Sequence, residues 1–227
     1  MRAAKVNRRL FGKAALALLG APVVGCGAHG PAKPPTSPAA GFPAKDDRES
    51  LSTPEGDVWI DALDPQLGPK SARCVIVVFS DFQCPFCRDA ALVVRRLHKE
   101  RPEAIRVVFK HLPTQLHRSA QAAAIAAQIV FLEAGSQAFW RFHDRLFAEQ
   151  EQIDDEHLAD WAAAEGVSAD AIVARAPSAE RRVRDDVELA SRLGIHGTPH
   201  LYVNDRVVEG AYPYEAMKEW VDAALGA

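Results

Sequence analysis

The chain has 227 residues, of which 48% are hydrophobic and 25% are charged, the balance of an ordinary globular protein. This length accommodates one domain of ordinary size, or one domain that carries a large insertion. The formal net charge is −3 and the sequence has no long basic patch, so we expect no nucleic-acid partner.

The first 25 residues have the pattern of an export signal peptide. Basic side chains are concentrated before residue 14, and residues 14–19 form an apolar run. That run is far shorter than the roughly 20 residues that a membrane-spanning helix needs. Residues 7–13, Asn-Arg-Arg-Leu-Phe-Gly-Lys, are similar to a twin-arginine export motif, although Gly12 stands where a larger apolar residue is usual.

Cys26 follows Val23-Val-Gly25, a sequence that resembles a bacterial lipobox, in which the cysteine is lipidated and becomes the mature N-terminus. The alternative is an ordinary signal peptide with an unrelated cysteine. Residues 27–50 are rich in proline and glycine and cannot bury enough apolar surface to fold. We therefore expect a lipidated Cys26 and a flexible tether over residues 26–55, then a domain over residues 56–227. This arrangement places the domain outside the cytoplasm, where disulfides are common.

The first strong signal of a buried strand lies at residues 75–79. These five residues, Val-Ile-Val-Val-Phe, are all β-branched or aromatic, which predicts a strand buried on both faces. A short edge strand is expected earlier, at residues 58–60, and residues 64–69 form a turn-rich approach to the central strand.

Two cysteines, Cys84 and Cys87, follow this strand and come directly before a helical pattern. Apolar side chains recur through residues 88–97 at the spacing of one helix face, so we expect a helix that reaches about Glu100. At a helix N-terminus, unpaired N–H groups and the helix dipole favour a thiolate over a thiol. Cys84 is therefore predicted to be a nucleophile, with Cys87 as its partner sulfur within one turn.

Three other uses of a Cys-x-x-Cys pair agree less well with the sequence. A zinc site needs four ligands, and no second Cys-x-x-Cys or closely spaced histidine pair follows. Attachment of haem requires a histidine directly after the second cysteine, where this chain has Arg88. A structural disulfide remains an alternative, but the two-residue spacing and the helix-opening position argue against it. The pattern favours a redox-active pair that uses no metal and no cofactor.

Residues 105–110 predict a second strand, which would complete a parallel, right-handed β–α–β unit. The chain then changes to helical signals, which we interpret as an all-helical insertion over about residues 114–193. Gly135, Gly166 and Pro177 are expected to separate its helices. The expected helices cover residues 119–134, 137–149, 154–165, 168–176 and 178–194.

The last part of the chain predicts a hairpin and a helix. Residues 200–203 and 206–208 read as strands joined by the two-residue turn Asn204-Asp205, and residues 215–225 as an amphipathic helix. Without the insertion, the order is β–α–β followed by β–β–α. The sequence therefore predicts an α/β, thioredoxin-like fold, a central mixed sheet flanked by helices, with an all-helical insertion.

From about Asp64 to its end, the chain resembles the DsbA-like thiol–disulfide oxidoreductases, the branch of the thioredoxin fold with a helical insertion. Four stretches carry the resemblance: residues 67–72, 79–87, 139–147 and 197–199. Cys-Pro-Phe-Cys together with a distant Thr-Pro is a specific combination, whereas either motif alone is weak.

The resemblance implies roles for four residues besides the cysteines. In this family the proline that corresponds to Pro199 is cis and lies beside the cysteine pair, and the backbone of Thr198 would face an extended substrate chain. A cis bond costs only about 0.5–1 kcal/mol before proline. Pro85 and Phe86, between the two cysteines, are expected to contact substrate as well.

The chain also departs from the family pattern. Many relatives have a buried acid six positions before the first cysteine, where this chain has Val78, and strongly oxidising members often have histidine in place of Phe86. Since valine cannot accept a proton, we expect Cys87 to keep a high pKa. Asp81 is the nearest acid in sequence that could exchange a proton with Cys87. Capping of the turn before the helix is an equally good role for Asp81.

Other residues with reactive side chains are expected to be structural. Cys74 is predicted to be a buried, small hydrophobic residue rather than a third redox partner. His111, His117 and His143 are expected to anchor loops or helices. His200, directly after the Thr-Pro motif, is expected to line the substrate groove.

These observations lead to the interpretation of an exported, membrane-tethered thiol–disulfide oxidoreductase. We expect a dithiol oxidase that introduces disulfides into exported proteins through Cys84 and Cys87, with a membrane redox partner. A reductase or isomerase would use the same steps in another direction, and no motif decides between them. A carrier of a soft metal ion such as Cu(I) is a further alternative, against which the absence of a nearby Met-rich or His-rich stretch counts.

Overall fold

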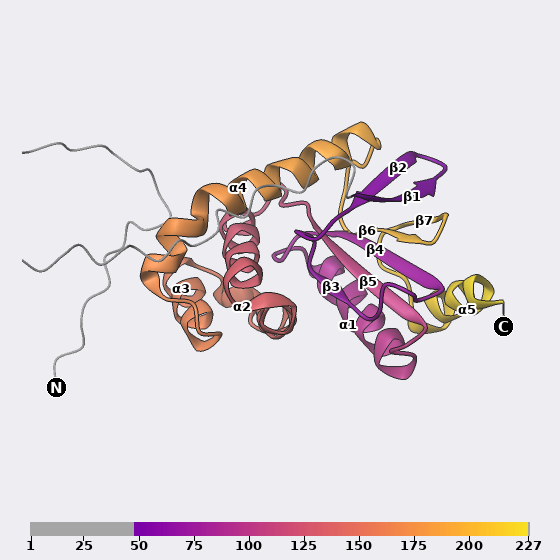
Figure 1. Ribbon diagram of the computed structural model, residues 1–227, viewed down its shortest axis with the longest axis horizontal. Helices are drawn as coiled ribbons and strands as arrows, with labels where there is room; N and C mark the ends of the chain where they lie inside the picture. The colour runs from indigo at the N-terminus through magenta and orange to yellow at the C-terminus, as the bar shows by residue number, and fades with distance from the viewer. Residues whose placement is uncertain (1–47, 227) are drawn as a thin grey trace, which may run out of the picture.

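A computed structural model describes residues 48–226 of the protein (Figure 1). The expected signal peptide, the lipidated Cys26 and most of the expected tether lie outside the described residues.

The centre of the fold is a mixed sheet with the strand order β3-β5-β4-β6-β7. β4 and β5 are parallel, and the other neighbouring pairs are antiparallel. β4 and β5 are almost entirely buried. Apolar residues fill both faces of β4, as the sequence predicted, whereas β5 also buries the polar side chains of Arg106, Lys110 and His111. The strands are β3 (Gln66–Leu67), β4 (Cys74–Ser80), β5 (Ile105–His111), β6 (His200–Val203) and β7 (Arg206–Glu209).

One face of the sheet is covered by two helices. α1 (Pro85–Glu100) crosses from β4 to β5, and α5 (Tyr214–Leu225) returns to the same face at the end of the chain (Figure 1). Val94 and Leu97 of α1 and Val221 of α5 are buried in this layer. The predicted β–α–β and β–β–α units are therefore confirmed.

The opposite face is covered by a hairpin that the sequence revealed only in part. β1 (Glu49–Thr53) pairs with β2 (Gly56–Ile60), and Val58 and Ile60 pack on that face of the sheet. The prediction had placed residues 49–53 in the tether, and the structure corrects this. Most side chains of β1 are exposed, so the strand lacks the alternating apolar pattern that would identify it.

The insertion lies between β5 and β6 and consists of helices alone. It comprises α2 (Ala120–Ala148), the 3-10 turn η2 (Gln150–Gln152), α3 (Asp155–Ala164) and α4 (Ala169–Arg192). In Figure 1, α2 lies between the sheet and α3, and α4 runs from α3 to the β1–β2 hairpin. The predicted interruption at Gly135 is confirmed, because its φ of 78° breaks the helical backbone inside α2.

The predicted break at Pro177 is wrong. α4 continues through this proline, so the two helices expected at residues 168–176 and 178–194 form one helix. This helix begins where Ser168 Oγ accepts the N–H of Ala171 at 3.2 Å. An interior proline costs about 3 kcal/mol or more, so the helix needs tertiary support. Ala179 and Val183, just beyond the proline, are fully buried and supply part of it.

Among the described residues, α2 is the one helix that is long and apolar enough, by length and composition alone, to cross a membrane. Its interruption at Gly135 and the complete burial of Ala127 and Phe139 in the core identify it as a core helix of the insertion.

Candidate functional site

The two predicted redox cysteines lie at the start of α1, where β4 ends. Cys84 is the N-cap residue, with φ −78° and ψ 122°, and Pro85 is the first helical residue. Cys87 lies one turn further and is 1% exposed, against 5% for Cys84. Both are free thiols in the structure. The predicted position of Cys84 at a helix N-terminus is confirmed.

The surroundings give the two thiols very different pKa values. A hydrogen bond from the Cys87 thiol and the N–H groups of Cys87 and Phe86 lower the pKa of Cys84 to about 5, although burial acts in the other direction. Burial and the hydrogen bond to Cys84 raise the pKa of Cys87 well above its ordinary value. Near neutral pH, Cys84 is therefore a thiolate and Cys87 a thiol. The directions of the two pKa shifts agree with the sequence-based expectation of a reactive Cys84 and a high pKa for Cys87.

The Thr198–Pro199 motif lies beside the cysteines even though it follows them by more than a hundred residues. The peptide bond between Thr198 and Pro199 is cis, as predicted. The thiol of Cys84 donates a hydrogen bond to the carbonyl oxygen of Thr198, which lies 3.5 Å from Sγ. Pro85 is exposed and Phe86 is 62% exposed, so both present surface next to Cys84. The structure thus brings all the predicted substrate-contacting residues together.

Asp81 holds the loop before α1. Its Oδ1 accepts the N–H of Gln83 at 2.8 Å, while its Oδ2 accepts the N–H and the hydroxyl of Thr114 and a bond from His117 Nδ1, each at 2.8 Å. Its contact with Cys87 is through the backbone, whose N–H lies 3.4 Å from Sγ. With both carboxylate oxygens occupied in this way, the capping role is the better explanation of Asp81.

Among residues 48–226, no carboxylate lines the cavity beside Val78. Val78, Ser80 and His143 line a small cavity between α1, α2 and the sheet. His143 is buried there, which lowers its pKa, and its Nδ1 is bonded to Asp144 Oδ1 at 2.9 Å. Its ring packs against Phe82, so it anchors α2 as expected.

His111 has a structural role, as expected, whereas the expectation that His200 lines the substrate groove is wrong. His111 is buried and bonded through Nε2 to Gln128 Oε1 at 3.0 Å. His200 does not line a groove by the cysteines, because it points to the face covered by the β1–β2 hairpin, where its Nε2 contacts Glu55 Oε2 at 3.0 Å. Alternation along β6 causes this, since neighbouring residues point to opposite faces.

Cys74 is fully buried at the start of β4, and burial raises its pKa to about 11. The expected role as a small hydrophobic residue is confirmed. Among residues 48–226, one group of side chains is close enough to hold a metal ion, Glu55, His200 and Glu209, and it includes neither redox cysteine.

Gln150, in η2, contacts the Cys84 loop although no sequence pattern indicated it. Its Nε2 donates to the carbonyl oxygens of Phe82 and Cys84, each at 2.8 Å. A second contact holds the same loop, since Gln83 Oε1 accepts the N–H of Ser119 at 2.5 Å. No local pattern identifies either contact, because a glutamine after a helix is usually solvated.

Comparisons with known proteins agree with this geometry. The family described as Thioredoxin matches residues 62–223. The Na(+)/H(+) antiporter NhaA 1 of Salinispora arenicola is 36% identical over 195 residues, which cover 81% of this chain but 29% of that relative. Disulfide bond formation protein D of Bacillus subtilis is 25% identical over 171 residues, covering 71% of this chain and 77% of the relative. The catalytic domain of Proteus mirabilis ScsC has a TM-score of 0.65 at 26% identity, covering 74% of this chain and 92% of that one.

The chain spans less than a third of the antiporter that it matches, so that relative's activity is not carried over to it. The matched family covers most of this chain, including the Cys84–Cys87 pair and the Thr198–Pro199 motif. The chain belongs to the thioredoxin family, and its mixed sheet with a helical insertion is the fold of the DsbA-like thiol–disulfide oxidoreductases.

Proposed function

We propose that the protein is a dithiol oxidase, a thiol–disulfide oxidoreductase that introduces disulfides into exported proteins through Cys84 and Cys87. The observation that carries the proposal is the opposite shift of the two thiol pKa values, with Cys84 at about 5 and Cys87 raised. The printed name of the Bacillus subtilis relative, disulfide bond formation protein D, agrees with this chemistry.

The reaction begins from the Cys84–Cys87 disulfide. A substrate thiolate attacks Cys84 Sγ, the bond between the cysteines breaks, and Cys87 leaves with the electron pair and takes up a proton. A second substrate thiolate then attacks the substrate sulfur of the mixed disulfide, so that Cys84 leaves as a thiolate. The substrate gains one disulfide and the enzyme becomes a dithiol.

The low pKa of Cys84 favours the oxidase direction. A stable thiolate is a good leaving group in the second step, and it stabilises the reduced form of the enzyme, which makes the disulfide more oxidising. Reductase and isomerase activity would start from the dithiol form. The alternative of a soft-metal carrier has less support, because neither cysteine belongs to a group of three or more candidate ligands among the described residues.

We further propose that the enzyme works outside the cytoplasm, tethered through a lipid on Cys26, and that a membrane redox partner reoxidises its dithiol. The basic and apolar start of the chain and its Val-Val-Gly-Cys sequence support this location. Intact-mass analysis of the mature protein tests the lipid, and an unmodified N-terminus would contradict it.

Two measurements test the activity. Cys87→Ala should accumulate mixed disulfides with substrate proteins, whereas Cys84→Ala and the buried control Cys74→Ala should accumulate few. The reverse pattern would show that the cysteine roles are exchanged. A reduction potential above about −200 mV for the pair supports the oxidase, and a value below about −250 mV supports a reductase.

A further inference from the structure

The loop that carries Cys84 is bound by one side chain of the helical insertion. Gln150 lies in η2, directly after α2, and is 9% exposed. Its Nε2 lies 2.8 Å from the carbonyl oxygen of Phe82 and 2.8 Å from that of Cys84. A primary amide has two N–H donors, so one group satisfies both carbonyls.

The start of α1 depends on this contact because the helix has little capping of its own. The N-cap residue Cys84 makes no side-chain capping bond, and Pro85 has no N–H. The Cys84 carbonyl is the first acceptor of the helix and receives the N–H groups of Cys87 and Arg88 at 3.1 Å and 3.2 Å. Gln150 holds this same oxygen, and therefore the peptide that joins the loop to the helix.

The orientation of that peptide determines where the sulfur lies. The N–H groups that stabilise the Cys84 thiolate belong to the first turn of α1, so the sulfur must remain above that turn. Among residues 48–226, Gln150 is the one side chain that hydrogen-bonds to the Cys84 backbone. Its amide carries no net charge, so it restrains the loop without adding a charge near the thiolate.

We propose that Gln150 is a positioning residue for Cys84: its amide fixes the peptide that carries the reactive sulfur and so sets the reactivity of the redox pair. The proposal rests on the proposed function, in which Cys84 is the attacked sulfur. It also assigns a role to the insertion, which would act on the active site through η2.

The test replaces the amide while the side-chain length is kept. Gln150→Met removes both donors, and Gln150→Glu presents a carboxylate to two carbonyl oxygens. The ultraviolet absorbance of the Cys84 thiolate, followed against pH, gives its pKa in each variant. We expect a rise of about one pH unit with methionine. We expect a larger rise with glutamate, because a negative charge disfavours a nearby thiolate. The pair should become less oxidising in the same order.

Gln128→Met is the matched control. Gln128 is fully buried in α2 and also donates its amide to a loop carbonyl, that of Leu63 at 3.1 Å. This variant should lose stability while the pKa of Cys84 stays at the wild-type value. A folded Gln150→Met protein with the wild-type pKa would overturn the proposal. An equal rise in Gln128→Met would overturn it too, because the effect would then be general loosening.

If Gln150→Met does not fold, Gln150→Asn takes its place. Asparagine keeps the amide but is one methylene shorter, so it cannot reach both carbonyls unless the loop moves. It should give a smaller rise, and a wild-type pKa in this variant overturns the proposal. The proposed function fails separately, if Cys87→Ala traps no mixed disulfides, since that experiment uses a wild-type Gln150.

Discussion

The insertion meets the rest of the fold in two polar regions that differ in kind. The first, which we call the loop contact, binds the turn before α1 through hydrogen bonds that each join a side chain to a backbone group, made by Gln150, Ser119 and Thr114. The second, which we call the charge cluster, joins Lys110 of β5 and Asp64 to two residues of α4, Arg182 and Asp186.

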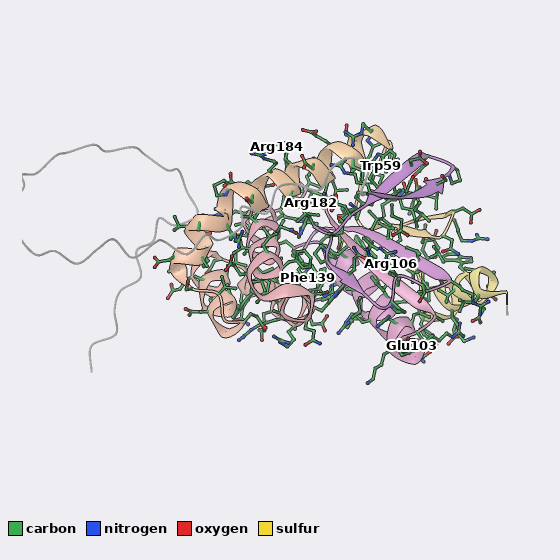
Figure 2. The ribbon with its side chains drawn as sticks, viewed as in Figure 1. Trp59, Glu103, Arg106, Phe139, Arg182 and Arg184 are labelled. Carbon is green, nitrogen blue, oxygen red and sulfur yellow. The ribbon has the colours of Figure 1, made fainter. Side chains whose placement is uncertain are left out.

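The charge cluster consists of buried ion pairs. Lys110 Nζ lies 2.7 Å from Asp64 Oδ1 and 3.4 Å from Asp186 Oδ1, and Arg182 Nη2 lies 2.9 Å from Asp186 Oδ1 and also contacts Asp64. Burial alone would lower the pKa of Arg182, but the surrounding carboxylates, including Asp61, raise it above its ordinary value. Arg182 projects from the side of α4 that faces the sheet (Figure 2).

The difference between the regions follows from what each one adjoins. Lys110 points to the same sheet face as Val108, which packs with the β1–β2 hairpin, whereas Cys84 and Cys87 pack on the other face. Buried ions shift the pKa of groups near them, so a charged attachment beside Cys84 would alter its thiolate. The loop contact also includes the Asp81 carboxylate, but the group that binds the Cys84 peptide itself is the neutral Gln150 amide, which holds that peptide without adding a charge. We infer that the charge cluster serves stability and that the loop contact serves reactivity.

The largest expected effect concerns the charge cluster. Arg182→Met leaves buried carboxylates with less compensating charge, so the free energy of unfolding should fall by about 3–5 kcal/mol. Urea unfolding measures this loss. Arg184→Met is the matched control, since Arg184 projects from the exposed side of the same helix (Figure 2) and should change stability by about 0.5 kcal/mol at most.

Two results would contradict the distinction between the charge cluster and the loop contact. One is a loss of less than about 1 kcal/mol in the free energy of unfolding of Arg182→Met. The other is a rise in the pKa of Cys84 in Arg182→Met as large as that in Gln150→Met.

The next effect is a dependence of stability on pH through His111, which adjoins the charge cluster. Its backbone N–H binds Asp186 and its ring binds Gln128. Burial lowers its pKa to about 3, so between about pH 6.5 and pH 3 the unfolded chain binds a proton that the folded protein does not. Stability from this group is therefore present above pH 6.5 and is lost as the pH falls, by about 2 kcal/mol between pH 7 and pH 5.

Urea unfolding at several pH values checks this, with His111→Gln expected to flatten the dependence. His143 and His98 also have pKa values lowered by burial and act in the same direction, whereas the raised pKa of Asp186 opposes them. The difference between wild type and variant isolates His111. An unchanged slope in His111→Gln would contradict the prediction.

The smallest effect concerns the neutral donors around Cys84. A hydrogen bond from the Cys87 thiol is the largest cause of the low pKa of Cys84, which is about 5. Cys87→Ala removes that donor and should raise the pKa by about one pH unit, whereas Cys87→Ser keeps a donor and should raise it less. The pH dependence of the alkylation rate of Cys84 measures both. Equal pKa values in the two variants would show that the backbone N–H groups alone stabilise the thiolate.

The features that depend on neighbouring residues could be predicted from the sequence. The apolar run of β4, the helix period after Cys87 and the turn at Asn204-Asp205 all predict local structure correctly. Gly135 marks the interruption of α2 because its positive φ suits a residue without a side chain. The reactive pair could be recognised in the same way, since the N–H groups that act on Cys84 belong to the helix that it opens.

The features that depend on residues far apart in the chain could not be predicted in this way. Gln150 and Cys84 are separated by 66 positions, and Arg182 and Asp64 by 118. Local preference also lost to packing where α4 continues through Pro177, and where β1 forms by pairing with β2 although its own pattern is weak. The physical reason is the same in each case: burial and hydrogen bonding across the fold supply free energy that no stretch of sequence contains by itself.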